Sequence, residues 1–102
     1  MNREISALSG KQKRYLRGLG NRLEDGVVVG HGGLSENFYT NLNSALNKKE
    51  LVKVRLQPAA GLEVKETAEM LSEETSSQVV QTFGRTILLY KKNSENPTIK
   101  LP

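Results

Sequence analysis

The sequence predicts a small α/β sandwich in which helices pack on a mixed four-stranded sheet. Three observations lead to this class. Apolar residues recur at helical spacing in three segments, β-branched or alternating runs occupy four others, and the order along the chain is α-β-α-β-α-β-β. Strands linked by helices require right-handed parallel crossovers, whereas the last two strands are close enough for an antiparallel hairpin. At 102 residues the chain has room for one core.

The first predicted helix runs from Gly10 to about Leu23, with Ser9 as its N-cap. Its apolar side consists of Tyr15, Leu16, Leu19 and Leu23. Glycines at positions 18 and 20 weaken this helix, so we expect it to be held by packing against the sheet. The alternative explanation of Gly18 is that it permits a close approach to that sheet.

A turn at Asp25-Gly26 leads into a β-branched run over residues 26–29, which is predicted to be a buried central strand. The glycine-rich segment 30–33 ends this strand, and Ser35 then caps a second helix that reaches about Lys48. An alternating strand over residues 51–56 is predicted to be half-buried, with Lys53 and Arg55 facing outward, and Pro58 closes it.

The third helix is predicted from Leu62 to about Thr75, followed by strands over residues 78–83 and 86–90. Gly84 and Arg85 between them match a two-residue hairpin turn with glycine first, and Arg85 is expected to project from its tip. Residues 1–92 are therefore assigned to one domain. The polar residues 93–102 are expected to form a loosely packed tail.

Composition excludes several classes of function. The chain has no cysteine and a single histidine, His31, which removes disulfides, thiolate nucleophiles and His-pair metal sites. No apolar run approaches membrane-spanning length, and the first residues lack a signal-peptide core, so a cytoplasmic protein is expected. The net charge of +4 is segregated along the chain. Residues 1–22 carry six basic residues against one acidic residue, whereas residues 23–47 carry no basic residue. Basic segments folded onto one side would bind a polyanion.

The glycine segment Gly30-His31-Gly32-Gly33 lies between a strand and the free N–H groups of a helix start. Such N–H groups favour a phosphate, although a turn that needs positive φ explains the glycines equally well. His31 is interpreted as an exposed turn residue, a phosphate or base contact, or, least favoured, a general base. Dinucleotide and P-loop motifs are excluded, since Ser35 stands where the former needs glycine and no Gly-Lys-Ser/Thr follows.

The basic side of the first helix carries Lys13, Arg14 and Arg17, with Lys11 and Arg22 at its edge. A solvated surface is the ordinary explanation of such a face, but Lys48, Lys49, Lys53, Arg55 and Arg85 are expected nearby. Tyr15 and Tyr39 could stack on bases, yet their positions beside apolar stripes favour core or boundary roles. Few aromatic residues are thus free, which favours recognition of the backbone and shape of structured RNA.

Four segments in order, residues 8–17, 29–37, 49–54 and 83–90, resemble the CRM (chloroplast RNA splicing and ribosome maturation) domain, and the resemblance covers residues 8–91. Residues 96–102 resemble the end of its stand-alone bacterial members, the YhbY-like proteins. The resemblance implies a fold like the C-terminal domain of translation initiation factor three. It further implies a G-x-x-G loop comparable to that of KH domains, and binding to RNA of large-subunit (50S) precursors.

By this resemblance, Gly30 and Gly33 belong to that loop and Arg85 belongs to the hairpin. The basic residues of the helix are Lys11, Arg14 and Arg17. His31 departs from the family pattern, in which its position is commonly basic.

The sequence therefore predicts a non-enzymatic RNA-binding domain with no cofactor, metal, membrane or small-molecule substrate. The candidate RNA-binding residues are Lys11, Lys13, Arg14, Arg17, Gly30, His31, Gly32, Gly33, Lys53 and Arg85. A protein-binding adaptor is the alternative, and it would need a contiguous exposed apolar patch. A nucleic-acid hydrolase is a less favoured alternative, because it would need carboxylates clustered beside the glycine segment. Only Glu24, Asp25 and Glu36 lie near that segment in sequence.

Overall fold

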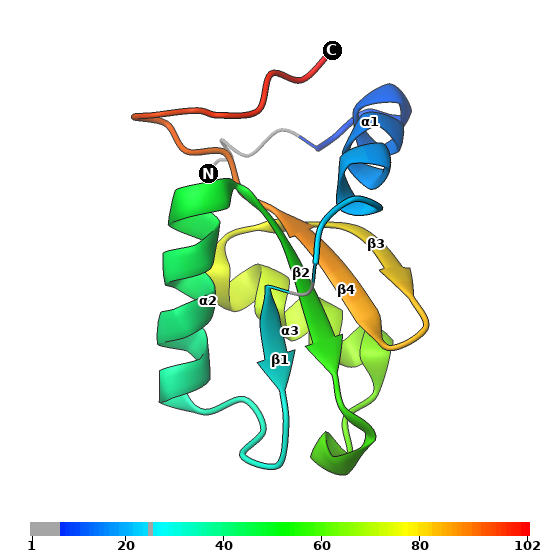
Figure 1. The fold of residues 1–102 in the computed structure, drawn as a ribbon, viewed down its shortest axis with the longest axis vertical. Helices are drawn as coiled ribbons and strands as arrows, with labels where there is room; N and C mark the ends of the chain where they lie inside the picture. The colour runs from blue at the N-terminus through cyan, green and yellow to red at the C-terminus, as the bar shows by residue number, and fades with distance from the viewer. Residues whose placement is uncertain (1–6, 25) are drawn as a thin grey trace.

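The structure is a computed structural model that describes residues 7–24 and 26–102. Its elements follow the predicted order, with one short 3-10 helix added after the second strand (Figure 1). They are α1 (Gly10–Gly20), β1 (Val27–Val29), α2 (Glu36–Lys49), β2 (Leu51–Leu56), η1 (Pro58–Ala60), α3 (Val64–Thr75), β3 (Gln78–Phe83) and β4 (Thr86–Tyr90). Asp25, assigned above to a turn, and residues 1–6, assigned to the domain, lie outside the described residues.

The four strands form one mixed sheet in the order β1-β2-β4-β3. β1 pairs with β2 in parallel, so α2 is the predicted crossover between them. β1 lies at the edge of the sheet and Val28 is 46% exposed, because α1 does not reach over its face, so the prediction of a buried central strand was wrong. β4 pairs antiparallel with both β2 and β3, and it therefore lies inside the sheet. The β3–β4 turn has Gly84 at a φ of 59°, which confirms a hairpin with glycine in the first turn position.

Helices cover both faces of the sheet, α2 and α3 one face and α1 part of the other (Figure 1). The larger core lies under α2 and α3 and includes Leu42, Leu46 and Leu71. The smaller core joins Leu16 of α1 to Leu51, Val80, Leu88 and Tyr90. One face of β2 carries Leu51, Lys53 and Arg55, which are buried, half-buried and exposed in that order. This face is therefore covered at one end and open at the other.

α1 ends at Gly20, three residues before the predicted end at Leu23. Leu23 still packs against the smaller core, but from the turn that follows the helix. Gly20 and not Gly18 makes the close approach to the sheet: a Cβ at Gly20 would lie 2.6 Å from Leu88 Cδ2, whereas one at Gly18 would meet no atom within 4 Å. The expectation about Gly18 was therefore wrong.

The C-terminal tail is firmly attached, which contradicts the predicted loose packing. Glu50, fully buried just after α2, accepts hydrogen bonds from the backbone N–H groups of Asn93, Thr98 and Ile99. Ile99 and Leu101 pack against the smaller core. The tail thus closes the end of the molecule on which the last turn of α2 and the start of α1 lie (Figure 1).

Candidate nucleic-acid interface

The glycine loop, residues 30–33, is held between β1 and the start of α2. The Gly33 N–H donates to the Gly30 carbonyl at 3.0 Å, and Gly33 has a φ of 66°, so the loop is a turn that needs glycine there. Ser35 caps α2, because its Oγ accepts from the Phe38 N–H at 3.1 Å. A turn that needs positive φ therefore explains Gly33, but it does not explain Gly32.

Gly32 lies in open space, because a Cβ there would meet no atom within 4 Å. Gly30 is different, since its Cβ would lie 2.9 Å from the Gln57 side-chain oxygen. His31 is exposed, and an open groove of about 460 Å³ runs from the glycine loop past Ser35 and along α2. A ligand backbone can therefore reach the N-terminal end of α2 through the middle of the loop.

The predicted basic face is present on α1. The described helix contains no acidic residue, and its start is fixed by a capping box in which Ser9 and Gln12 bond reciprocally. Lys11 and Arg14 are exposed, Lys13 and Arg17 are half-buried, and Leu16 is buried against the sheet. These four residues, Lys11, Lys13, Arg14 and Arg17, are called the α1 cations below.

The α1 cations and the glycine loop do not form one patch. The molecule is 37 Å long, and the loop between β1 and α2 lies at the end opposite to α1 (Figure 1). No single phosphate can contact both. An RNA that engages both regions has to extend along the molecule.

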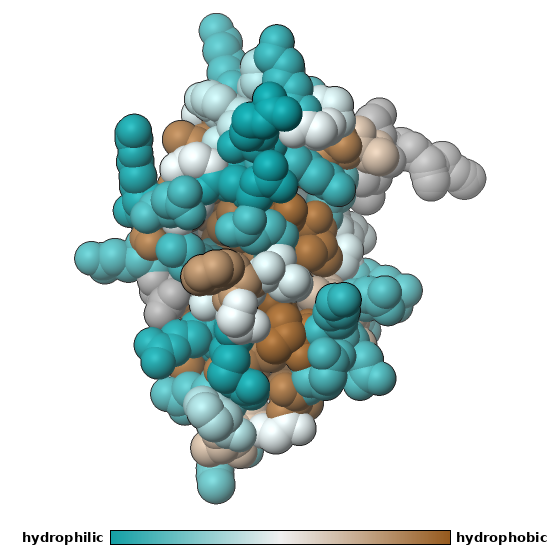
Figure 2. Space-filling view, turned by 90° about the vertical axis from the view of Figure 1, so that its right-hand side faces the viewer, coloured by the Kyte–Doolittle hydropathy of each residue, from teal (hydrophilic) through white to brown (hydrophobic). Residues whose placement is uncertain are grey.

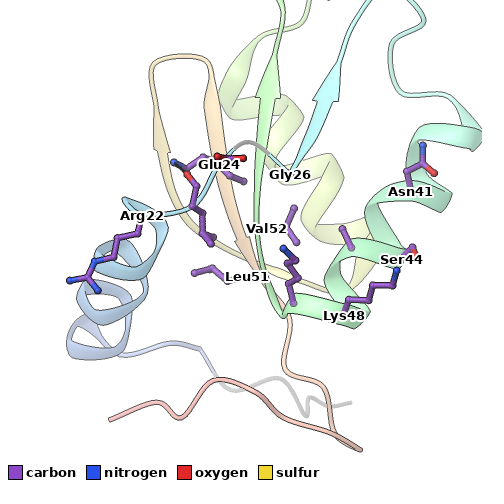
Figure 3. Close-up of a pocket in the computed structure, with 12 residues that line it drawn as sticks. Arg22, Glu24, Gly26, Asn41, Ser44, Lys48, Leu51 and Val52 are labelled. Carbon is purple, nitrogen blue, oxygen red and sulfur yellow. Dashed lines mark hydrogen bonds between the residues drawn. The ribbon is translucent and has the colours of Figure 1, made fainter.

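A groove of about 620 Å³ lies between these two regions, and basic side chains line it (Figure 3). Arg22 comes from the turn that follows α1, Lys48 comes from α2, and Leu51 and Val52 of β2 lie between them. We call it the basic groove after its four cations, Arg22, Lys48, Lys49 and Lys53. Among the described residues, Glu24 is the acidic residue in its lining. The sequence analysis missed this groove, although the run of charges over residues 48–55 was a signal for it.

The basic groove and the groove beside the glycine loop adjoin, because Gly26, Asn41 and Ala45 line both. Lys53 is the one predicted site residue in the basic groove. It is half-buried and not fully outward, and its Nζ donates to the Leu23 carbonyl at 2.8 Å. This bond ties the turn after α1 to β2 and holds one wall of the groove.

Arg85 does not project from the hairpin tip as predicted. Its Nε donates to the Leu56 carbonyl at 3.0 Å, and its Nη2 donates to the Leu62 carbonyl at 3.4 Å. The guanidinium therefore folds back on the segment between β2 and α3. A carbonyl at the end of a strand is a strong acceptor that the sequence pattern does not reveal.

The aromatic residues divide between core and surface. Tyr39 is half-buried and packs edge-on against Phe38, with the ring centroids 5.5 Å apart. Burial raises the pKa of Tyr39, and the negative charge of Glu74 raises it by a smaller amount. Tyr15, expected in the core or at its boundary, is 42% exposed, and Phe83 is 76% exposed. The sequence analysis did not single out Phe83.

Residues 7–24 and 26–102 contain no group of three or more His, Cys, Asp or Glu side chains that could hold a metal ion. No helix among them is long and apolar enough to span a membrane.

Taken together, the open helix start and the cation-lined groove define a small α/β domain with a surface suited to a polymer of phosphates. The profile of the CRS1 / YhbY (CRM) domain matches residues 8–91. The chain therefore belongs to the CRM domain family, as its sequence segments indicated.

Relatives of this chain come from several bacteria. A Bacillus subtilis protein named "Probable RNA-binding protein YqeI" is 41% identical over 95 residues, covering 93% of this chain and 99% of the relative. A Haemophilus influenzae protein named "RNA-binding protein" is 36% identical over 98 residues, covering 96% and 98%. The solution structure of a hypothetical Staphylococcus aureus protein superposes with a TM-score of 0.74 at 39% identity, covering 94% of this chain and all of that one. The α/β fold is thus confirmed.

Proposed function

We propose that this chain is a non-enzymatic RNA-binding protein that holds the phosphates of structured RNA. The observation that carries this proposal is the continuity of the basic groove with the groove beside the glycine loop, through Gly26, Asn41 and Ala45. Phosphates of one strand repeat at regular intervals, so an elongated, cation-lined groove suits them better than it suits a compact anion. The names of the B. subtilis and H. influenzae relatives support the same class of ligand.

Each region has a distinct role in this proposal. The glycine loop offers backbone N–H groups at the start of α2, the basic groove offers ammonium and guanidinium groups, and the α1 cations lie at the far end. Arg85 remains a candidate RNA contact, because its guanidinium has further N–H donors besides the two that bond to carbonyl groups. Resemblance to the YhbY-like proteins extends the proposal to ribosomal RNA of large-subunit precursors in the cytoplasm.

The test compares two exposed lysines on different helices. Lys48→Ala removes a cation from the basic groove, and Lys65→Ala removes one from α3, which does not line it. In titrations with fragments of large-subunit ribosomal RNA, we expect Lys48→Ala to weaken binding and to reduce the slope of log affinity against log salt by about one. Lys65→Ala should bind like the parent protein.

Two outcomes contradict the proposal. Equal affinities and equal salt slopes for the two variants and the parent would remove the basic groove from the interface. Association with large-subunit precursors that survives nuclease treatment and high salt would instead favour a protein-binding adaptor.

A further inference from the structure

One face of the sheet is open beyond the end of α1. In the part of the face that α1 covers, Leu88 and Tyr90 are buried. The next row of residues runs in register across all four strands: Val28, Arg55, Thr86 and Phe83. Strand alternation places all four side chains on the α1 side of the sheet. Within this row Val28 is 46% exposed and Phe83 is 76% exposed.

Phe83 borders a hollow of about 260 Å³ that reaches back to α1. Gly20 and Asn21 line it at the helix end, and Lys53 and Leu88 line it on the sheet. Lys53 also lines the basic groove, so the hollow and the groove meet at this side chain. The ring of Phe83 therefore lies beside the path proposed for the phosphates.

The surroundings of Phe83 favour a nucleobase over an apolar protein surface. Figure 2 shows the molecule from the side on which the β3–β4 hairpin lies in Figure 1, and there the hydrophobic residues are separated by hydrophilic side chains. A protein helix or strand needs a larger contiguous apolar patch for stable docking. A nucleobase needs one aromatic face, and the cationic side chains of Lys53 and Arg55 on the same face of β2 complement its phosphate.

We propose that Phe83 is a stacking platform for an unpaired RNA base, on the open part of the sheet next to the basic groove. This inference rests on the proposed function, because the strand that supplies the base is the one whose phosphates occupy the groove. It adds selectivity to backbone binding: a paired base is already stacked in its helix and cannot cover the ring without being extruded. The protein should therefore prefer RNA that has unpaired bases beside a helical stem.

The experiment uses two RNA probes with the same number of phosphates, a hairpin with an adenine-rich loop and a fully paired duplex. We expect Phe83→Ala to bind the hairpin about fivefold or more weaker than the parent and to bind the duplex equally well. Phe83→Tyr, which keeps the ring, should retain hairpin affinity. Phe83→Leu, which keeps apolar bulk without a ring, should lose it. Met70→Ala is the matched control, because Met70 is another exposed apolar side chain, located on α3.

Stacking is read out directly with 2-aminopurine in place of one loop adenine. Its fluorescence should change on binding the parent and Phe83→Tyr, and much less on binding Phe83→Ala. If Phe83→Ala binds the hairpin as tightly as the parent and gives the same fluorescence, the stacking platform is refuted while RNA binding stands. If the parent binds neither probe, the proposed function fails, and the inference with it.

Discussion

The backbone N–H of Ile99 donates a 2.8 Å hydrogen bond to the buried carboxylate of Glu50, 49 residues earlier in the chain. The Thr98 N–H and hydroxyl donate to the same oxygen at 2.8 and 3.0 Å, and the Asn93 N–H donates to the other oxygen at 2.6 Å. Burial by itself would raise the pKa of this carboxyl, but the donors from Asn93, Ile99 and Thr98 outweigh it and hold the pKa below its usual value. Glu50 is therefore an ionised anchor for the tail.

Replacing Glu50 with glutamine should destabilise the fold. The amide has one acceptor oxygen and no charge, and its NH₂ group would face the N–H of Asn93 or of Thr98 and Ile99. We expect the free energy of unfolding to fall by about 1.5–3 kcal/mol in urea titrations. Glu69→Gln, at an exposed position of α3, should change it little. Equal stability of the two variants would mean that the tail is not anchored by this charge.

The same carboxylate makes stability depend on pH. Because its pKa is lower in the folded protein, the stabilisation by ionised Glu50 is complete above the ordinary carboxyl value of 4.5 and is lost as the pH falls through the lower, folded-state pKa. We expect urea titrations at a series of pH values below 5 to show a steeper loss of stability in the parent than in Glu50→Gln. Parallel curves for the two proteins would contradict this assignment.

The two glycines of α1 should respond oppositely to alanine. Gly18→Ala adds a methyl group in open space and removes a flexible helical residue, so we expect a gain of about 0.5–1 kcal/mol in the free energy of unfolding. Gly20→Ala would push against the buried side chain of Leu88, and we expect a loss of about 1 kcal/mol. Thermal or urea unfolding measures both. A gain at both positions would show that α1 does not pack closely on Leu88.

The glycine loop offers a test that separates geometry from charge. Gly32→Asp is compatible with the fold because its Cβ meets no atom, but it places a negative charge where the phosphate is proposed to lie. We expect RNA affinity to fall more than tenfold, about 1.4 kcal/mol or more, with an unchanged circular dichroism spectrum. His31→Lys should preserve or raise affinity. Folded Gly32→Asp that binds RNA like the parent would leave the loop as a turn only.

Among the described residues, the sequence pattern predicted each α-helix and strand, though not η1, because each of these elements depends on neighbours in sequence. Ser9 and Gln12 are three positions apart and form the capping box that starts α1. Gly84 supplies the positive φ that closes the hairpin. The parallel crossover through α2 also followed, since one hand of connection is strongly favoured.

Tertiary structure alone decided how the charged residues are used. Glutamate is rarely buried, so nothing local marked Glu50, whose donors lie 43 to 49 residues away. Arg85 reached carbonyl groups that only the finished sheet presents. The basic groove unites Arg22 from the turn after α1, Lys48 from α2 and Lys53 from β2, which become neighbours only when α1 and α2 pack beside β2.

For Phe83, the sequence determined the position in the strand, and the tertiary structure determined the exposure. Its place at the end of β3 was predictable from the alternating run and the turn that follows. Whether its face of the sheet is covered depends on the length of α1, which ends at Gly20 and leaves the last row of the sheet open. Local sequence thus determines which elements form, because hydrogen bonds within an element and side-chain spacing are short-range. The surface left for a ligand depends on how far one element extends over another, and that is a property of the packed molecule.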